Sequence, residues 1–157
     1  MNIATADTVI PIPFMTDTRS VRLHFDFEDQ KRKMTPDEFW TFCAVNRKLR
    51  AELTKDGDVI IMAPTGFESS DSNSEIVFQL KAWAKNDRTG KVTESSGAYV
   101  LPNGATYAPD AAWVRKDRLM DFTPDQLKKF LPLTPDFVIE LRSESDSLND
   151  AKAKMVE

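Results

Sequence analysis

The chain has 157 residues, of which 41% are hydrophobic and 29% are charged, and its net charge is -4. This length and composition predict one soluble globular domain with a single core. No apolar run reaches the ~20 residues of a membrane-spanning helix and the N-terminus lacks a basic signal region, so we expect a cytoplasmic protein. The negative charge argues against a coat protein held on nucleic acid by bulk electrostatics, but not against an enzyme whose carboxylates hold a cation.

The chain offers few groups for other kinds of chemistry. Its one cysteine, Cys43, excludes an internal disulfide and a zinc framework, and its helical surroundings favour a buried structural thiol. The one histidine, His24, lies in an alternating stretch with no catalytic partner nearby in sequence. We therefore interpret His24 as a surface residue of a strand.

The first part of the chain predicts a lead-in and then a helix. Residues 1–34 form an irregular lead-in with one short strand over 21–25, and the domain occupies residues 35–157. Thr35, Pro36 and Glu38 are typical of a capping box with proline in the first turn, so a helix begins there and ends near Asn46.

The middle of the chain predicts a hairpin and a second helix. The stretches 49–54 and 59–63 are strands joined by an Asp-Gly turn, and the second strand is apolar on both faces and therefore central. Residues 67–74 are expected to be a polar loop that ends in another capping box at 72–75. The helix that follows would end near residues 86–90, with Trp83 on its buried face.

The last part predicts short strands around two acidic residues. Residues 91–94 and 98–101 are strands, and the turn at 102–104 leads into a strand that carries Asp110. A short helix begins at Thr123, a strand over 137–143 carries Glu140, and a last helix begins at residue 148.

The two acidic residues, Asp110 and Glu140, lie in apolar segments. A carboxylate in such a place is costly unless a cation or hydrogen bonds compensate it, which suggests a metal site. Mg²⁺ prefers carboxylate oxygens and needs only one or two of them, so neighbouring strands could supply both ligands. The strand period of two points Arg142 to the same face as Glu140, beside the metal.

Several segments around these residues occur in a recognisable order. They are Asn46–Gly57, Met62–Gly66, Leu101–Gly104, Ala108–Ala111, Phe137–Ser143, Ser145–Leu148 and Lys154–Met155. Together they strongly resemble the bacterial Uma-type restriction endonuclease family of the PD-(D/E)XK nuclease superfamily, from about residue 35 to the end. The resemblance implies an α/β fold of restriction-endonuclease type, with a mixed, partly antiparallel sheet flanked by helices.

The resemblance also implies roles for individual residues. Asp110 and Glu140 would be the metal-binding carboxylates, and Glu52 a further acidic site residue. Lys154 would be the counterpart of the motif lysine, which in this family has moved to the following helix. Arg142 departs from the motif, since it keeps a positive charge but cannot act as a base. The family also continues with a further strand, so we expect a C-terminal piece to be missing.

Each role has a structural alternative. Asp110 could be a turn residue after proline, Glu52 an ordinary charge on a hairpin edge, and Lys154 a solvated helix residue. Arg142 could pair with Glu140 instead of contacting a phosphate.

The function expected from these residues is Mg²⁺-dependent cleavage of DNA, with Mn²⁺ as an alternative ion. A homodimer is expected because cutting both strands requires two sites. The alternative is a nucleic-acid or protein-binding module that keeps the nuclease fold without turnover.

Overall fold

The computed structural model describes residues 20–25 and 32–141. Its elements are β1 (Ser20–Leu23), α1 (Pro36–Val45), β2 (Arg50–Leu53), β3 (Val59–Met62), α2 (Phe67–Asp87), β4 (Gly90–Glu94), β5 (Tyr99–Val100), β6 (Thr106–Tyr107), β7 (Ala111–Arg115), α3 (Lys116–Leu119), a 3₁₀ turn η1 (Gln126–Lys128) and β8 (Phe137–Ile139). None of these helices is both long and apolar enough to cross a membrane.

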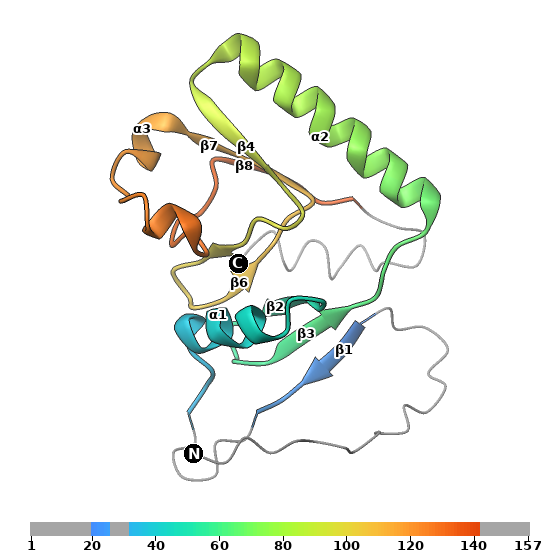
Figure 1. Ribbon diagram of the computed structural model, residues 1–157, viewed down its shortest axis with the longest axis vertical. Helices are drawn as coiled ribbons and strands as arrows, with labels where there is room; N and C mark the ends of the chain where they lie inside the picture. The colour runs from blue at the N-terminus through green and yellow to red at the C-terminus, as the bar shows by residue number, and fades with distance from the viewer. Residues whose placement is uncertain (1–19, 26–31, 142–157) are drawn as a thin grey trace.

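The strands form two sheets. One has the order β1-β3-β2-β6-β5 and the other the order β4-β7-β8, with every named pair antiparallel and one isolated parallel bridge between Tyr99 and Leu131. Helix α2 crosses the smaller sheet, and α1 lies against the larger one (Figure 1). The expected α/β class, with sheets flanked by helices, is confirmed.

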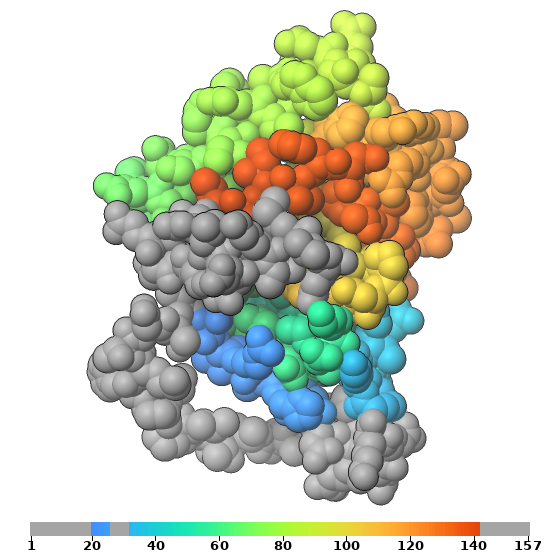
Figure 2. Space-filling model, turned by 180° about the vertical axis from the view of Figure 1, so that it is seen from behind, coloured from blue at the N-terminus to red at the C-terminus, as the bar shows by residue number. Residues whose placement is uncertain are grey.

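The described residues contain two apolar clusters. Phe39 of α1 packs with Leu53 and Val59 of the β2–β3 hairpin, and all three are fully buried. In the second cluster Tyr99 of β5 packs with Ala112 and Val114 of β7. Because β5 belongs to the larger sheet and β7 to the smaller one, this second cluster joins the two sheets. From behind, residues coloured orange to red lie above those coloured blue to teal (Figure 2).

Local sequence signals correctly predicted the first helix and the hairpin that follows it. The capping box at Thr35 is formed, with Glu38 N–H donating to the Thr35 hydroxyl and the Glu38 carboxylate accepting from Thr35 N–H. Gly57 has a φ of +86°, as the Asp-Gly turn requires. Strand β3 lies between β1 and β2, which confirms its expected central position.

The expected loop over residues 67–74 is wrong, because α2 already begins at Phe67. Ser70 N–H donates to the Gly66 carbonyl at 3.1 Å, and the Ser74 hydroxyl bonds back to the Ser70 carbonyl within the helix. A serine that bonds to the carbonyl four residues before it looks in sequence like a cap. The expectation that Trp83 is buried is also wrong, since it is 50% exposed and touches Trp113 edge-to-face.

The region around Asp110 also differs from the expected single strand. The chain pairs as β6 in the larger sheet and then as β7 in the smaller one, and Asp110 lies in the bend between them. The helix expected after Thr123 is only the short η1, and α3 was not predicted. The helix expected from residue 148 lies outside the described residues.

Replacing Thr35 by alanine should lower the free energy of unfolding by about 1 kcal/mol, because α1 loses its capping hydroxyl. Chemical denaturation of the variant and the parent measures this difference. Thr41→Ala is the control, since the exposed Thr41 hydroxyl bonds only to a carbonyl inside the helix. Equal losses in both variants would contradict the capping role.

The capping box also predicts a pH dependence. Hydrogen bonds from the Arg32 guanidinium, and then from Thr35, lower the pKa of Glu38 from 4.5 to about 2. A carboxyl group whose pKa is lower in the folded state adds stability above its unfolded pKa and loses it as the pH falls through the folded pKa. The stability difference between the parent and Glu38→Gln should therefore be full at neutral pH and shrink between about pH 5 and pH 2. A difference that stays constant over this range would refute the assignment.

Candidate functional site

The two acidic residues that the sequence singled out lie next to each other in space. Ala111 of β7 pairs with Ile139 of β8, so the same register places Asp110 opposite Glu140. Both residues therefore lie at the end of a strand pair and not inside it. The bond from Leu141 N–H to the Asp110 carboxylate agrees with this placement of the two residues. The role of the two carboxylates as metal ligands stays a prediction.

Two groups hold the Asp110 carboxylate, whose side chain is 17% exposed. Its Oδ2 accepts a hydrogen bond from Leu141 N–H at 2.9 Å, and its Oδ1 lies 3.3 Å from Nη2 of Arg50. The first bond ties the bend before β7 to the residue after Glu140. The second brings a permanent positive charge from β2 of the other sheet to the same carboxylate.

Glu52 lies on β2, two residues after Arg50, and is only 6% exposed. Its Oε1 accepts a hydrogen bond from Ala108 N–H at 3.0 Å. This bond holds the segment that leads through Pro109 to Asp110. Because β2 lies between β3 and β6, Glu52 is not the exposed hairpin-edge charge of the alternative interpretation.

The described residues do not include Arg142 or Lys154, so their predicted places at the site lie outside the described part of the chain. The structure adds Arg50, which sequence reasoning missed. One signal could have indicated it, since alternate residues of a strand face the same way and Arg50 precedes Glu52 by two positions.

The donor set at this site fits a hard divalent cation. Among the described residues no group of three histidine, cysteine, aspartate or glutamate side chains is arranged to hold a metal, so a closed, all-protein site is not found there. Mg²⁺ needs only one or two carboxylates and keeps several waters. Each carboxylate oxygen has two lone pairs, so Asp110 can keep its bond to Leu141 N–H and still offer oxygen to an ion.

The sequence profile described as "Uma2: Putative restriction endonuclease" matches residues 36–157, which is more than half of the chain. The chain belongs to the Uma2 family. The resemblance expected from the sequence is thus confirmed, and this Uma2 protein is a member of a nuclease family. The match includes Glu52, Asp110 and Glu140.

A solved structure supports the fold of this Uma2 protein. It is similar to the crystal structure of a putative nuclease belonging to DUF820 from Anabaena variabilis ATCC 29413, with a TM-score of 0.57 and 20% sequence identity. The alignment covers 78% of this chain and 66% of that one, so this chain spans slightly less than two thirds of the neighbour. A comparison with curated proteins found no match.

Substitutions at Glu52 separate its structural and metal-binding roles. Glu52→Ala leaves the Ala108 N–H without this acceptor and should cost about 1–3 kcal/mol of stability. Glu52→Gln keeps an oxygen for that bond and should be much less destabilising. Denaturation curves test both changes.

If Glu52 also binds the ion, Glu52→Gln should weaken Mg²⁺ binding while the fold remains stable. Equal destabilisation by alanine and glutamine would contradict the hydrogen-bonding role. Unchanged Mg²⁺ affinity in Glu52→Gln would show that Glu52 only positions the Asp110 segment.

Proposed function

We propose that this Uma2 protein is an endonuclease that hydrolyses DNA phosphodiester bonds with Mg²⁺, or with Mn²⁺ in its place. The observation that carries the proposal is the arrangement of Asp110. Its carboxylate lies opposite Glu140, is fixed by Leu141 N–H and is in contact with Arg50. A member of a nuclease family in which a cation contacts one carboxylate, with a second acidic residue opposite it, offers groups of the kind that phosphodiester hydrolysis requires.

Asp110 and Glu140 would hold the ion. A bound Mg²⁺ supplies charge neutralisation at the phosphate and lowers the pKa of an attacking water. Leu141 N–H keeps the Asp110 carboxylate in one orientation, so that little reorganisation is needed when the substrate arrives. Glu52 would hold the segment that carries Asp110 in place through its bond to Ala108 N–H. It would also supply a carboxylate oxygen as a ligand if the ion lies within its reach.

Positive groups would complete the site. The Arg50 guanidinium, 3.3 Å from Asp110, can donate to a phosphate oxygen while it remains close to the carboxylate. From the family motif, Lys154 would position water or stabilise charge, and Arg142 would contact phosphate. An arginine side chain does not serve as a general base in proteins, so the base must come from another group. A homodimer would bring two such sites to the two strands of a duplex.

One observation favours a second candidate, a nucleic-acid or protein-binding module without turnover. The Arg50–Asp110 ion pair already compensates the carboxylate, as a structural interaction would. In that case Asp110 would bind no ion, and the protein would keep the fold of a nuclease for binding alone.

Replacing Asp110 by alanine should abolish Mg²⁺-dependent nicking of plasmid DNA and the heat of Mg²⁺ or Mn²⁺ binding. The reason is that the variant loses one of two carboxylates that hold the ion. Gel assays of plasmid nicking and calorimetric titration measure the two effects. The control is Asp125→Ala, which removes an 88% exposed carboxylate that pairs with Lys128.

A variant without Asp110 that cuts as well as the parent would refute the catalytic assignment. A parent protein that neither takes up Mg²⁺ or Mn²⁺ nor cuts DNA would favour the binding module.

A further inference from the structure

An open groove of about 600 Å³ lies beside the candidate site. One wall comes from the end of α1 and the segment that leads into β2, and the other from the turn between β4 and β5. Trp40 and Phe130, whose rings meet edge-to-face with centroids 4.8 Å apart, contribute apolar surface. The groove is large enough to hold part of a polymer and not only a single ion.

The charge of the groove is opposite to that of the whole molecule. Its lining includes Arg47, Lys48 and Arg50 but no aspartate or glutamate, although the chain has a net charge of -4. Arg47 and Lys48 are exposed and have no ion-pair partner within residues 20–25 and 32–141. The Arg47 Nε–H donates to the Ala44 carbonyl, which leaves its terminal nitrogens available. Two cations without ion-pair partners in a groove favour an anionic ligand.

The groove leads to the candidate site. Arg50 lines it and also contacts Asp110, and Ala108 lines it while its N–H is held by Glu52. A chain of phosphates that followed Arg47 and Lys48 would therefore arrive at Arg50 beside the Asp110 carboxylate. A lone phosphate would not need three cations in a row along a groove.

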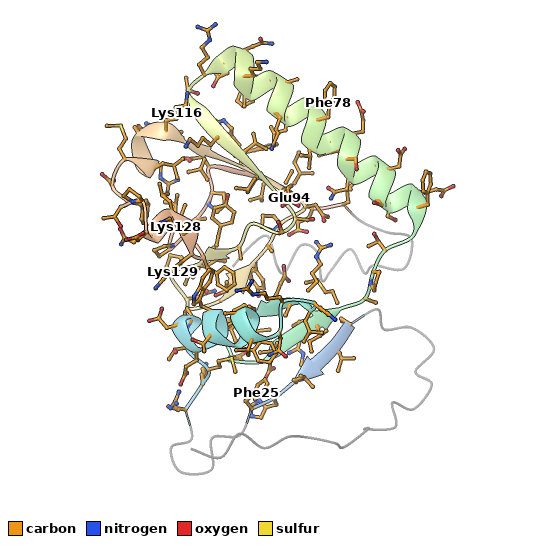
Figure 3. All side chains as sticks on the ribbon, in the orientation of Figure 1. Phe25, Phe78, Glu94, Lys116, Lys128 and Lys129 are labelled. Carbon is orange, nitrogen blue, oxygen red and sulfur yellow. The ribbon has the colours of Figure 1, made fainter. Side chains whose placement is uncertain are left out.

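The opposite wall is held in place by Glu94 at the end of β4, where the small sheet turns toward the large one (Figure 3). The Glu94 carboxylate accepts hydrogen bonds from Ser96 N–H at 3.2 Å and from the Ser96 hydroxyl. The charge of Glu94 is thus engaged by the turn, and Glu94 is not part of the lining. The groove therefore has one basic wall and, opposite it, a turn held by hydrogen bonds to Glu94. Its aromatic surface is suited to contact with sugars and bases.

We propose that this groove, from Arg47 and Lys48 to Arg50, binds the phosphodiester backbone of the DNA strand that continues from the scissile phosphate at Asp110. This inference rests on the proposed function for the place of the scissile phosphate. The groove itself is a binding site whose occupancy can be measured without cleavage.

The test is binding of a labelled duplex oligonucleotide by fluorescence anisotropy, in EDTA so that no cleavage occurs, over a series of salt concentrations. The double variant Arg47→Ala/Lys48→Ala should bind roughly tenfold more weakly, and its salt slope should be smaller by about 1.8, because each phosphate contact contributes about 0.9. The control Lys81→Ala/Lys85→Ala removes the same charge from exposed positions on α2 and should leave both values unchanged.

Lys48→Glu is a second variant, and it should not destabilise the fold, because the Lys48 side chain makes no hydrogen bond within the described part of the chain. It should weaken binding more than Lys48→Ala and leave the melting temperature unchanged. Equal affinity and salt slope in the parent, the double variant and Lys48→Glu would overturn the proposal. Tighter binding of RNA of the same sequence would overturn the assignment to DNA.

Cleavage assays in Mg²⁺ separate this proposal from the proposed function. If the parent cuts DNA but the groove variants bind as well as the parent, the groove assignment fails and the nuclease assignment stands. If the parent binds DNA without cutting it and the groove variants bind DNA more weakly, the nuclease assignment fails and the groove assignment stands.

Discussion

The hydrogen bond from Leu141 N–H to the Asp110 carboxylate is the contact on which the site depends. Asp110 lies where the chain leaves the larger sheet and enters the smaller one, and Leu141 follows directly after β8 and Glu140. The bond therefore fixes both acidic residues relative to each other. A partly buried carboxylate loses part of its hydration, so the main-chain N–H both stabilises the bend and orients the oxygen atoms.

Contacts from β2 extend this arrangement into the larger sheet. Arg50 reaches Asp110 directly, and Glu52 reaches the Asp110 segment through Ala108. The two sheets are also joined by packing of Tyr99 against β7. The candidate site thus lies at the junction of the sheets, where displacement of either one would separate charges from their partners.

Signals within a few residues predicted much of the fold, and contacts between distant residues could not be predicted in this way. The capping box at Thr35 and the turn at Gly57 follow from local chemistry. The pairing of Asp110 with Glu140 was expected from two apolar strands, but the exchange between sheets at Asp110 was not, because strand pairing over short segments is decided by tertiary packing. The strand period could have placed Arg50 on the same face as Glu52, but it could not supply their partners. The contacts of Glu52 with Ala108 and of Arg50 with Asp110 join residues far apart in the chain. The serines of α2 misled the prediction because the same hydroxyl can cap a helix or bond inside it.

Electrostatics links the candidate site to its expected substrate, since the chain is acidic overall but has arginine and lysine in the groove beside Asp110.

The proposed function depends on Asp110 and Glu140 together holding a divalent ion. A crystal structure of the protein with Mn²⁺, using anomalous scattering to locate the ion, tests it most directly. An anomalous peak is expected within about 2.3 Å of an oxygen of each carboxylate, with the Arg50 guanidinium either displaced from Asp110 Oδ1 or sharing that oxygen with the ion. An ion bound elsewhere, with the Arg50–Asp110 ion pair unchanged, would contradict the claim.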